Sequence, residues 1–402
     1  MHASAVLQRC LGSALGSMHT LRRRVLMSAV DALIAGRRLT LIDLARSWLG
    51  ADRVRAPLKA MDRLLSNEHL HAERERVYAG MARWLLRCQQ PVIIVDWSEL
   101  KNDKSWHMLR AAVAVGGRTL TILDQVFPGG LQGSPQAERQ FLQRLKQILP
   151  AQARPILVTD AGFRTPWFRA VTAMGWRWVG RLRHRTYVKP IEAPATPEQW
   201  LPCKALYALV RKVPRDLGLM HTLPKQCWVC RMIVHGRPPK GRKHHTLQGL
   251  SVRSSHSRKQ ARREREPWLL VVSPELSDLS AQQLVNLYAK RMQIELSFRD
   301  LKSHRYGQGF EDSLTHKRHR LEILLLINAL AAFASWLIGM ACEAAGIDRW
   351  LSPWRSHRRL YSILRLGREA LSRQWLRVPI DELLARLRHP SAYVLDQIGV
   401  AR

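Results

Sequence analysis

One glutamate is set among cationic and phenolic side chains on a stretch with helical periodicity. At about 100° per residue, Tyr288, Arg291, Glu295, Arg299 and Lys302 fall within an arc of roughly 80°, so one helix would present them together. An apolar set beside that arc can face a core: Leu287, Ile294, Phe298 and Leu301. The glutamate could hold a metal ion while its neighbours hold a phosphodiester backbone. The alternative is an ordinary solvated face of a charged helix.

Two aspartates follow apolar runs that are typical of buried strands. The run from Pro91 ends at Asp96, and the run from Pro155 ends at Asp160. If those strands are neighbours, their tips lie together, and a later helix could bring Glu295 alongside. Three carboxylates at one point suit Mg²⁺ that keeps waters and binds phosphate, and two such ions support in-line displacement. Taken singly, each aspartate could instead be a strand-end or helix-capping acid.

The charge of the chain indicates the class of its partner. The sequence has 402 residues, is 46% hydrophobic and carries a formal net charge of +34. Its length allows two or three domains with real cores. So large an excess of positive charge favours a polyanionic partner, most simply nucleic acid. Ribosome-associated and membrane-surface proteins can also be basic, so charge does not indicate the activity.

The pattern of elements predicts an α/β chain with five segments. Residues 1–90 are predicted to be a helical DNA-binding domain, although a plain helical packing domain fits nearly as well. Residues 91–182 have a β-β-β-α-β-α-β order, the first part of a core, with a hairpin turn at Gly116-Gly117 and a helix capped by Ser134. Thr40-Leu41-Ile42-Asp43 and Ser280-Ala281-Gln282-Gln283 resemble capping boxes that open helices, and the apolar run from Trp268 to Val272 is typical of a strand. Residues 183–265 are a basic, β-rich insertion, in which 235–265 hold ten Lys/Arg, four His and one acid. Such a segment is expected to be mobile unless a polyanion orders it. Residues 266–312 form the second part of the core with the Glu295 helix, and 313–402 a helical C-terminal region.

Residues 323–342 form an apolar run about as long as a membrane span. Asn328 and Ser335 interrupt the run, and Glu322 and Glu343 bracket it. A helix buried against a sheet has the same pattern, and we favour that interpretation and expect no membrane partner. No signal peptide is evident at the N-terminus.

The six cysteines show no dense disulfide framework, which suits a reducing compartment. Cys227 and Cys230 form a lone CxxC. A structural zinc site would need two more ligands, so two thiols on a short strand are the favoured interpretation.

Several motifs resemble the DDE transposases of the IS4 group. They are Asp96-Trp-Ser, Asp160-Ala-Gly-Phe and the spacing of Tyr288, Arg291, Glu295 and Lys302. Arg63-Leu-Leu-Ser-Asn-Glu-His-Leu-His, Glu266-Pro-Trp268 and Lys290-Arg-Met-Gln-Ile-Glu295 are similar as well, so the resemblance covers most of the chain.

The resemblance implies an RNase H-like core with a mixed sheet, interrupted between Asp160 and Glu295 by a mainly β insertion and flanked by helical domains. It implies cut-and-paste transposition of an insertion sequence in the bacterial cytoplasm, associated with the nucleoid, through strand cleavage, hairpin formation and strand transfer at terminal inverted repeats. Asp96, Asp160 and Glu295 would be the catalytic triad, holding two Mg²⁺ ions for which Mn²⁺ can substitute. The partners would be double-stranded DNA, both transposon ends and target, and a second copy in a homodimer on the DNA.

The DNA-binding residues implied by the resemblance surround that triad. Tyr288, Arg291 and Lys302 would hold phosphates near the scissile position, and Arg299 shares their predicted face. Trp268 would stack on a base flipped out during hairpin formation, or else be a core strand tryptophan. Arg181 would be a further basic contact. A catalytically silent DNA-binding protein and a membrane-associated protein are the alternative functions.

Overall fold

The computed structural model of the chain describes residues 2–183, 186–191, 200–224, 227–236, 254–255, 266–351, 361–374 and 398. The chain divides into two compact units. Unit 1 comprises Met1–Ile156 and Arg291–Arg402, and unit 2 comprises Leu157–Lys290. The two units are described in turn.

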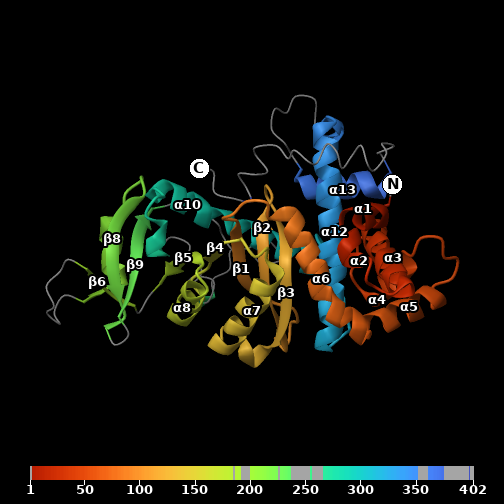
Figure 1. Ribbon diagram of the computed structural model, residues 1–402, viewed down its shortest axis with the longest axis horizontal. Coiled ribbons are helices and arrows are strands. Elements are labelled where there is room, and N and C mark those ends of the chain that lie inside the picture. Colours follow the sequence, from red (N-terminus) through yellow and green to blue (C-terminus); the bar gives the residue numbers. More distant parts are fainter. Residues whose placement is uncertain are drawn as a thin grey trace. The chain divides into compact units, whose positions relative to one another are not determined.

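The N-terminal part of unit 1 is helical, as the sequence predicts (Figure 1). The helices are α1 (Ala3–Cys10), α2 (Gly12–Leu15), α3 (Thr20–Gly36), α4 (Leu41–Arg46), α5 (Arg55–Leu65) and α6 (Glu68–Leu85). The predicted cap of α4 is present, since Thr40 Oγ1 accepts a hydrogen bond from the backbone N–H of Asp43 at 3.2 Å. A DNA-reading role for α4 and α5 stays a prediction.

Three antiparallel strands follow in unit 1: β1 (Val92–Glu99), β2 (Trp106–Ala114) and β3 (Thr119–Pro128), in the order β3-β2-β1. The predicted turn between β2 and β3 is built on Gly116 and Gly117, whose φ angles of 82° and 96° suit glycine. Helix α7 (Pro135–Ile148) comes next, with Ser134 as its N-cap at 3.2 Å from the N–H of Ala137. These elements form the first part of the predicted core.

The C-terminal part of unit 1 holds α11 (Met292–Lys302), α12 (Arg318–Ala344) and α13 (Ile363–Ser372). Helix α12 contains the run that could have been a membrane span. Among the described residues it is the one helix long and apolar enough to cross a bilayer, with a mean hydropathy of 2.2, and 94% of its most apolar window is buried. It packs against β3, α3, α6 and α13 within its unit (Figure 1). Helix α12 is therefore a buried core helix in the folded chain, which is the interpretation that the sequence favoured.

Unit 2 is mainly β. Strand β4 (Ile156–Thr159) begins at the boundary and is followed by α8 (Thr165–Ala173) and by β5 (Arg177–Leu182), β6 (Tyr187–Pro190), β7 (Leu201–Pro202), β8 (Arg215–Thr222), β9 (Trp228–His235) and β10 (Trp268–Val272). From β5 onward the strands lie in the order β5-β10-β9-β8-β6-β7, and each neighbouring pair is antiparallel. The insertion between Asp160 and Glu295 is thus mainly β where it is described.

The order β1-β2-β3-α7-β4-α8-β5 is the one that the sequence predicts. The fold class is α/β with a mixed sheet, consistent with an RNase H-like core flanked by helices. Most of the basic 235–265 segment, namely 237–253 and 256–265, lies outside the described residues, and so does much of the C-terminal region beyond residue 351.

The single helix predicted to carry Tyr288 through Lys302 is in fact two helices. Helix α10 (Ala281–Lys290) opens with the predicted capping box, in which Ser280 N–H donates to Gln283 Oε1 at 2.9 Å and Gln283 N–H donates to Ser280 Oγ at 3.3 Å. It ends before Arg291, and α11 starts after it. Arg291 keeps helical dihedral angles of −52° and −35°, so the periodicity of side chains continues although the hydrogen-bonded helix is interrupted. Tyr288 therefore belongs to unit 2, and Arg291, Glu295 and Lys302 to unit 1.

Candidate active site

Asp96 lies inside β1, because the strand continues past the predicted end at Asp96 to Glu99, and its side chain is only 12% exposed. Its Oδ1 accepts a hydrogen bond from the backbone N–H of Trp97 at 2.9 Å. Across the sheet it is paired in register with Arg110, whose guanidinium is already held by the buried carboxylate of Asp124 through two bonds of 2.7 Å. Arg110 is thus committed to Asp124, and Asp96 takes its cation from another element.

That cation is Arg291, at the start of α11. Its Nη1 lies 3.4 Å from Asp96 Oδ2 and 2.8 Å from Glu295 Oε1. The Glu295 side chain is 46% exposed, so the pair of carboxylates opens to solvent on the glutamate side. Two acids that are distant in the chain therefore meet at one positive group. A divalent metal ion that bound these two carboxylates would therefore have to displace the Arg291 guanidinium.

Lys302 fixes the other end of α11 to the same strand. Its Nζ donates a hydrogen bond to the backbone carbonyl of Glu99, the last residue of β1, at 3.2 Å. Burial lowers the pKa of the Lys302 ammonium, with Glu99 and Glu311 opposing that effect. Helix α11 is therefore held against β1 at two levels, by Arg291 at Asp96 and by Lys302 at Glu99, and this sets the position of Glu295.

Asp160 follows β4 in unit 2 and is half-buried. Its Oδ1 accepts a hydrogen bond from the N–H of Gly162 at 2.7 Å, which fixes the carboxylate over the turn that leads to α8. The carboxylate lines a cavity of about 670 Å³ together with Arg164, Arg181 and Arg183. The surroundings of Asp160 in its own unit are therefore cationic and open to a polyanionic ligand.

Trp268, Tyr288 and Arg181 form a packed group in unit 2. The Trp268 ring is 8% exposed and meets the ring of Tyr288, 2% exposed, edge to face at 4.7 Å between centroids. Arg181 Nη2 donates to the carbonyl oxygens of Glu266 at 3.3 Å and Pro267 at 3.1 Å, which lead directly into β10. Burial, and after it the nearby Arg183, lowers the pKa of Arg181. The residues predicted to touch DNA here are mostly covered by protein, and Arg181 supports the backbone that positions Trp268.

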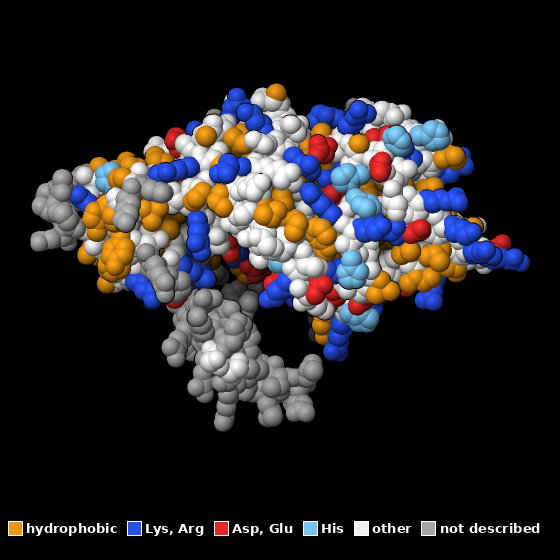
Figure 2. Space-filling model, turned by 90° about the horizontal axis from the view of Figure 1, so that it is seen from below, with side chains coloured by type: hydrophobic (Ala, Val, Ile, Leu, Met, Phe, Trp, Pro, Cys, Tyr) orange, Lys and Arg blue, Asp and Glu red, His pale blue; other side chains and the backbone are white. Residues whose placement is uncertain are grey.

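Arg299 is exposed on α11, one turn after Glu295, as its predicted position on the DNA-facing side requires. On the face shown in Figure 2, basic side chains outnumber acidic ones, as the net charge leads one to expect. The described surface is thus suited to a polyanion.

Each unit carries carboxylates of the kind that hard divalent cations prefer. Asp96 and Glu295 carry them in unit 1, and Asp160 carries one in unit 2. In the part of the chain that the structure describes, no three His, Cys, Asp or Glu side chains gather closely enough to form a metal site. The same holds for the CxxC: Cys230 is buried, and Cys227 Sγ lies 2.9 Å from His221 Nδ1, without further ligands among those residues.

A family model described as a transposase DDE domain matches residues 87–334, more than half of the chain. The chain belongs to the DDE transposase family. No curated protein matches it. The matched residues include Asp96, Asp160 and Glu295, and DDE transposases generally use divalent metal ions and act on DNA. The match thus covers the carboxylates described above, and their role as a catalytic triad stays a prediction.

Sequence reasoning did not find every charged group near these carboxylates of the transposase. Arg164 and Arg183 share the cavity of Asp160, and neither was singled out. The available signal was their position: Arg164 lies one turn beyond Asp160, and Arg183 follows the strand that carries Arg181. A basic residue within a few positions of a strand-end acid is too common to be specific without the fold.

Proposed function

We propose that this transposase moves an insertion sequence by a cut-and-paste reaction at terminal inverted repeats, through strand cleavage, a hairpin intermediate and strand transfer. We assign it to the IS4 group, because its motifs resemble those of that group and of the transposase of the insertion sequence IS10. The Tyr288, Arg291, Glu295 and Lys302 spacing and the family match over residues 87–334 support this assignment. The reaction would take place in the bacterial cytoplasm on nucleoid DNA.

The observation that carries the proposal is the contact of Arg291 with both Asp96 and Glu295. The guanidinium of Arg291 can also bind a phosphodiester, because its planar set of N–H donors matches two phosphate oxygens. When DNA enters, the guanidinium can turn to a phosphate and leave the two carboxylates to a metal ion. The ion pair would then be the resting state of a metal site.

The residues that would hold the metal are Asp96, Asp160 and Glu295, with two Mg²⁺ ions as the natural cofactor and Mn²⁺ as a substitute. Bound Mg²⁺ would supply Lewis-acid activation of the attacking oxygen and charge stabilisation for the leaving oxygen. Lys302 and Tyr288 would position the strand through its phosphates. A homodimer on paired ends would let each copy act on one end of the element.

The decisive experiment is metal-dependent cleavage of DNA that carries the gene with its flanking sequence. Glu295→Gln should abolish cleavage in Mg²⁺ and in Mn²⁺ while end binding stays within about twofold, since the substitution removes a ligand charge and little volume. Glu68→Gln, at an exposed position on α6 with the same change in charge, is the control and should cleave normally. Normal cleavage by Glu295→Gln would refute the assignment of the triad.

A further inference from the structure

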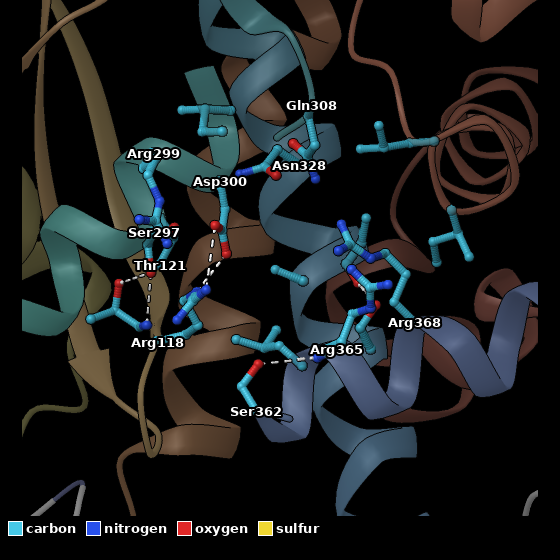
Figure 3. Close-up of a pocket in the computed structure, with 18 of the residues that line it drawn as sticks. Arg118, Thr121, Ser297, Arg299, Asp300, Gln308, Asn328, Ser362, Arg365 and Arg368 are labelled. Carbon is cyan, nitrogen blue, oxygen red and sulfur yellow. Dashed lines mark hydrogen bonds and ion pairs between the residues drawn. The ribbon is translucent and has the colours of Figure 1, made fainter. Parts of the chain in front are cut away.

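Unit 1 contains a cavity of about 460 Å³ that no step of the proposed reaction uses (Figure 3). Its walls come from β2, β3, α3, α11, α12 and α13. A cavity of this size can hold a nucleotide-sized ligand. The figure shows charged side chains from α11 on one side and from α13 on the other.

The cavity has a strong excess of positive charge. Of the described residues that line it, five are arginines, at positions 110, 118, 299, 365 and 368, and Asp300 is the acid. Asp300 is paired with Arg118, and Arg110 is paired with Asp124, so the excess comes from the other three arginines. Arg365 shares the carboxylate of Glu369, at 2.9 Å, with two further arginines, so that acid is more than neutralised.

The side chains of Arg299 and Arg368 form no ion pair or hydrogen bond with the part of the chain that the structure describes. The Nε of Arg368 is buried without a partner there. Burial, and after it the neighbouring Arg365, lowers the pKa of the Arg368 guanidinium. Arg368 is half-buried, and Asp300 and Glu369 offset only part of the effect of burial on its charge. The remaining cost of holding this charge would be recovered by an anionic ligand in the cavity.

Helix α12 leaves room for such a ligand. The four positions that it contributes to the cavity are Asn328, Ala331, Ala332 and Ser335, which share one face at helical spacing. They include both polar residues that interrupt its apolar run. The rest of the helix carries large apolar side chains, so the cavity lies beside the part of α12 whose side chains are small or polar.

Two glycines hold α13 close enough to α12 to bring its arginines to the cavity. A Cβ at Gly367 would overlap the carbonyl oxygen of Ser335, and a Cβ at Gly339 would overlap that of Ile363. The two backbones therefore pack directly on each other. This close approach fixes Arg365 and Arg368 on the side that faces α11 (Figure 3).

We propose that this arginine cavity binds a phosphate group of a DNA strand, at a site separate from the carboxylates. The proposal rests on the proposed function, and it names where a further part of the DNA is held. Arg299 links the two places, because it lies on α11 one turn from Glu295 and lines the cavity. Tyr306 and Tyr361, 71% and 43% exposed, stand among the lining residues and offer aromatic faces to the bases of an unpaired strand.

The test uses the full chain and a labelled DNA duplex with an unpaired tail, and measures affinity at several salt concentrations. Arg368→Gln and Arg299→Gln should each weaken binding roughly tenfold and lower the salt slope by about one, the signature of one lost phosphate contact. Arg139→Gln, at an exposed position on α7 with the same change in charge, should change neither value appreciably.

Stability separates a binding role from a structural one. Arg368→Gln should leave the melting temperature of the DNA-free protein unchanged or raise it, because the substitution removes a half-buried charge that burial disfavours. If it lowers the melting temperature sharply, Arg299→Gln decides the question, since its side chain is exposed.

DNA affinities of both variants equal to that of Arg139→Gln would overturn the proposal. A second result would also overturn it: inorganic pyrophosphate raises the melting temperature of the wild type but not of Arg368→Gln, while Arg368→Gln binds DNA as tightly as the wild type. The ligand of the cavity would then be a free anion and not DNA. Metal-dependent cleavage tests the proposed function separately. A protein that cleaves DNA, but whose cavity variants bind normally, keeps that function and loses this site; one that never binds DNA loses both.

Discussion

The guanidinium of Arg291 lies 3.4 Å from the carboxylate of Asp96, although 195 positions separate the two residues in the chain. The same nitrogen lies 2.8 Å from Glu295. Arg291 therefore neutralises two predicted metal ligands in the absence of metal, and any ion that binds them must compete with it. This competition makes the role of Arg291 measurable.

Replacing Arg291 with Gln should separate metal binding from cleavage. We expect tighter Mn²⁺ binding to the DNA-free protein, because the competing cation is gone, and cleavage reduced at least about a hundredfold, because a phosphate contact is lost near the reacting bond. Titration followed by the electron paramagnetic resonance of free Mn²⁺ measures the first effect. Arg291→Lys should lie between the two proteins. Weaker Mn²⁺ binding in Arg291→Gln would contradict the competition.

Glu322 should govern the acid stability of unit 1. It is fully buried, and its carboxylate lies 2.6 Å from both His71 Nε2 and Arg74 Nη1 and accepts a bond from the N–H of Val126 at 3.1 Å. Burial alone would raise its pKa, but these partners together with Arg318 lower it to about 2. Glu322→Gln should cost about 3–5 kcal/mol, since it leaves Arg74 buried without its partner.

The sign of the pH effect follows from the lowered pKa of Glu322. Its contribution to stability is complete above the ordinary carboxyl pKa of 4.5 and is lost as the pH falls from there towards 2. Thermal melts at pH 7, 4 and 3 should therefore show the gap between wild type and Glu322→Gln closing as acid is added. Glu68→Gln should show no such pattern. A gap that is constant with pH would mean that the carboxylate is not ionised in the fold.

Trp268 should be needed for the hairpin more than for the first nick. Trp268→Ala removes an aromatic face that a flipped base could use, whereas the carboxylates are untouched. Products should therefore stop at the nicked stage on a denaturing gel, while Trp268→Phe keeps part of the hairpin. Trp268 is 8% exposed and packs on Tyr288, so its replacement can also lower stability. The assays should therefore be run well below the melting temperature of each variant. Equal loss of both steps would leave Trp268 as a core residue only.

DNA binding should weaken steeply with salt. With a net charge of +34, the chain is expected to make many phosphate contacts, and each releases counter-ions from the DNA. For six to ten contacts, affinity should fall roughly 10³- to 10⁵-fold between 50 and 200 mM salt. Fluorescence anisotropy with labelled DNA gives the slope. A flat response would argue that the positive charge serves another partner.

The features that the sequence predicted well are those that local rules decide. The caps at Thr40, Ser134 and Ser280 and the Gly116–Gly117 turn are each settled by a few neighbouring residues. Strands β1 and β10 were predicted because continuous apolar runs are buried on both faces. The α/β class follows from the order of such elements.

The features that the sequence missed depend on distant contacts. The sequence predicted one helix through Arg291, because the spacing of side chains is helical on both sides of it. The structure explains this spacing, since Arg291 keeps helical dihedral angles although the helix is interrupted there. The sequence also did not show that Tyr288 packs on Trp268 or that Arg181 donates to the carbonyl of Pro267, and the DNA contacts expected of both residues stay predictions. The arginine cavity is lined by residues of β3, α11, α12 and α13, which are distant in the sequence. The sequence indicated it only through Asn328 and Ser335, the polar residues that interrupt the apolar run of α12.

Helix α12 has a consequence for how the protein is made. A free segment of this hydropathy would invite aggregation or capture by a bilayer as it leaves the ribosome. Its partners α3, α6 and β3 all precede it in the chain, so they are synthesised first. The nascent chain can thus provide an apolar surface against which α12 packs when it leaves the ribosome. A truncation that removes α3 or α6 would leave part of the apolar surface of α12 uncovered during synthesis.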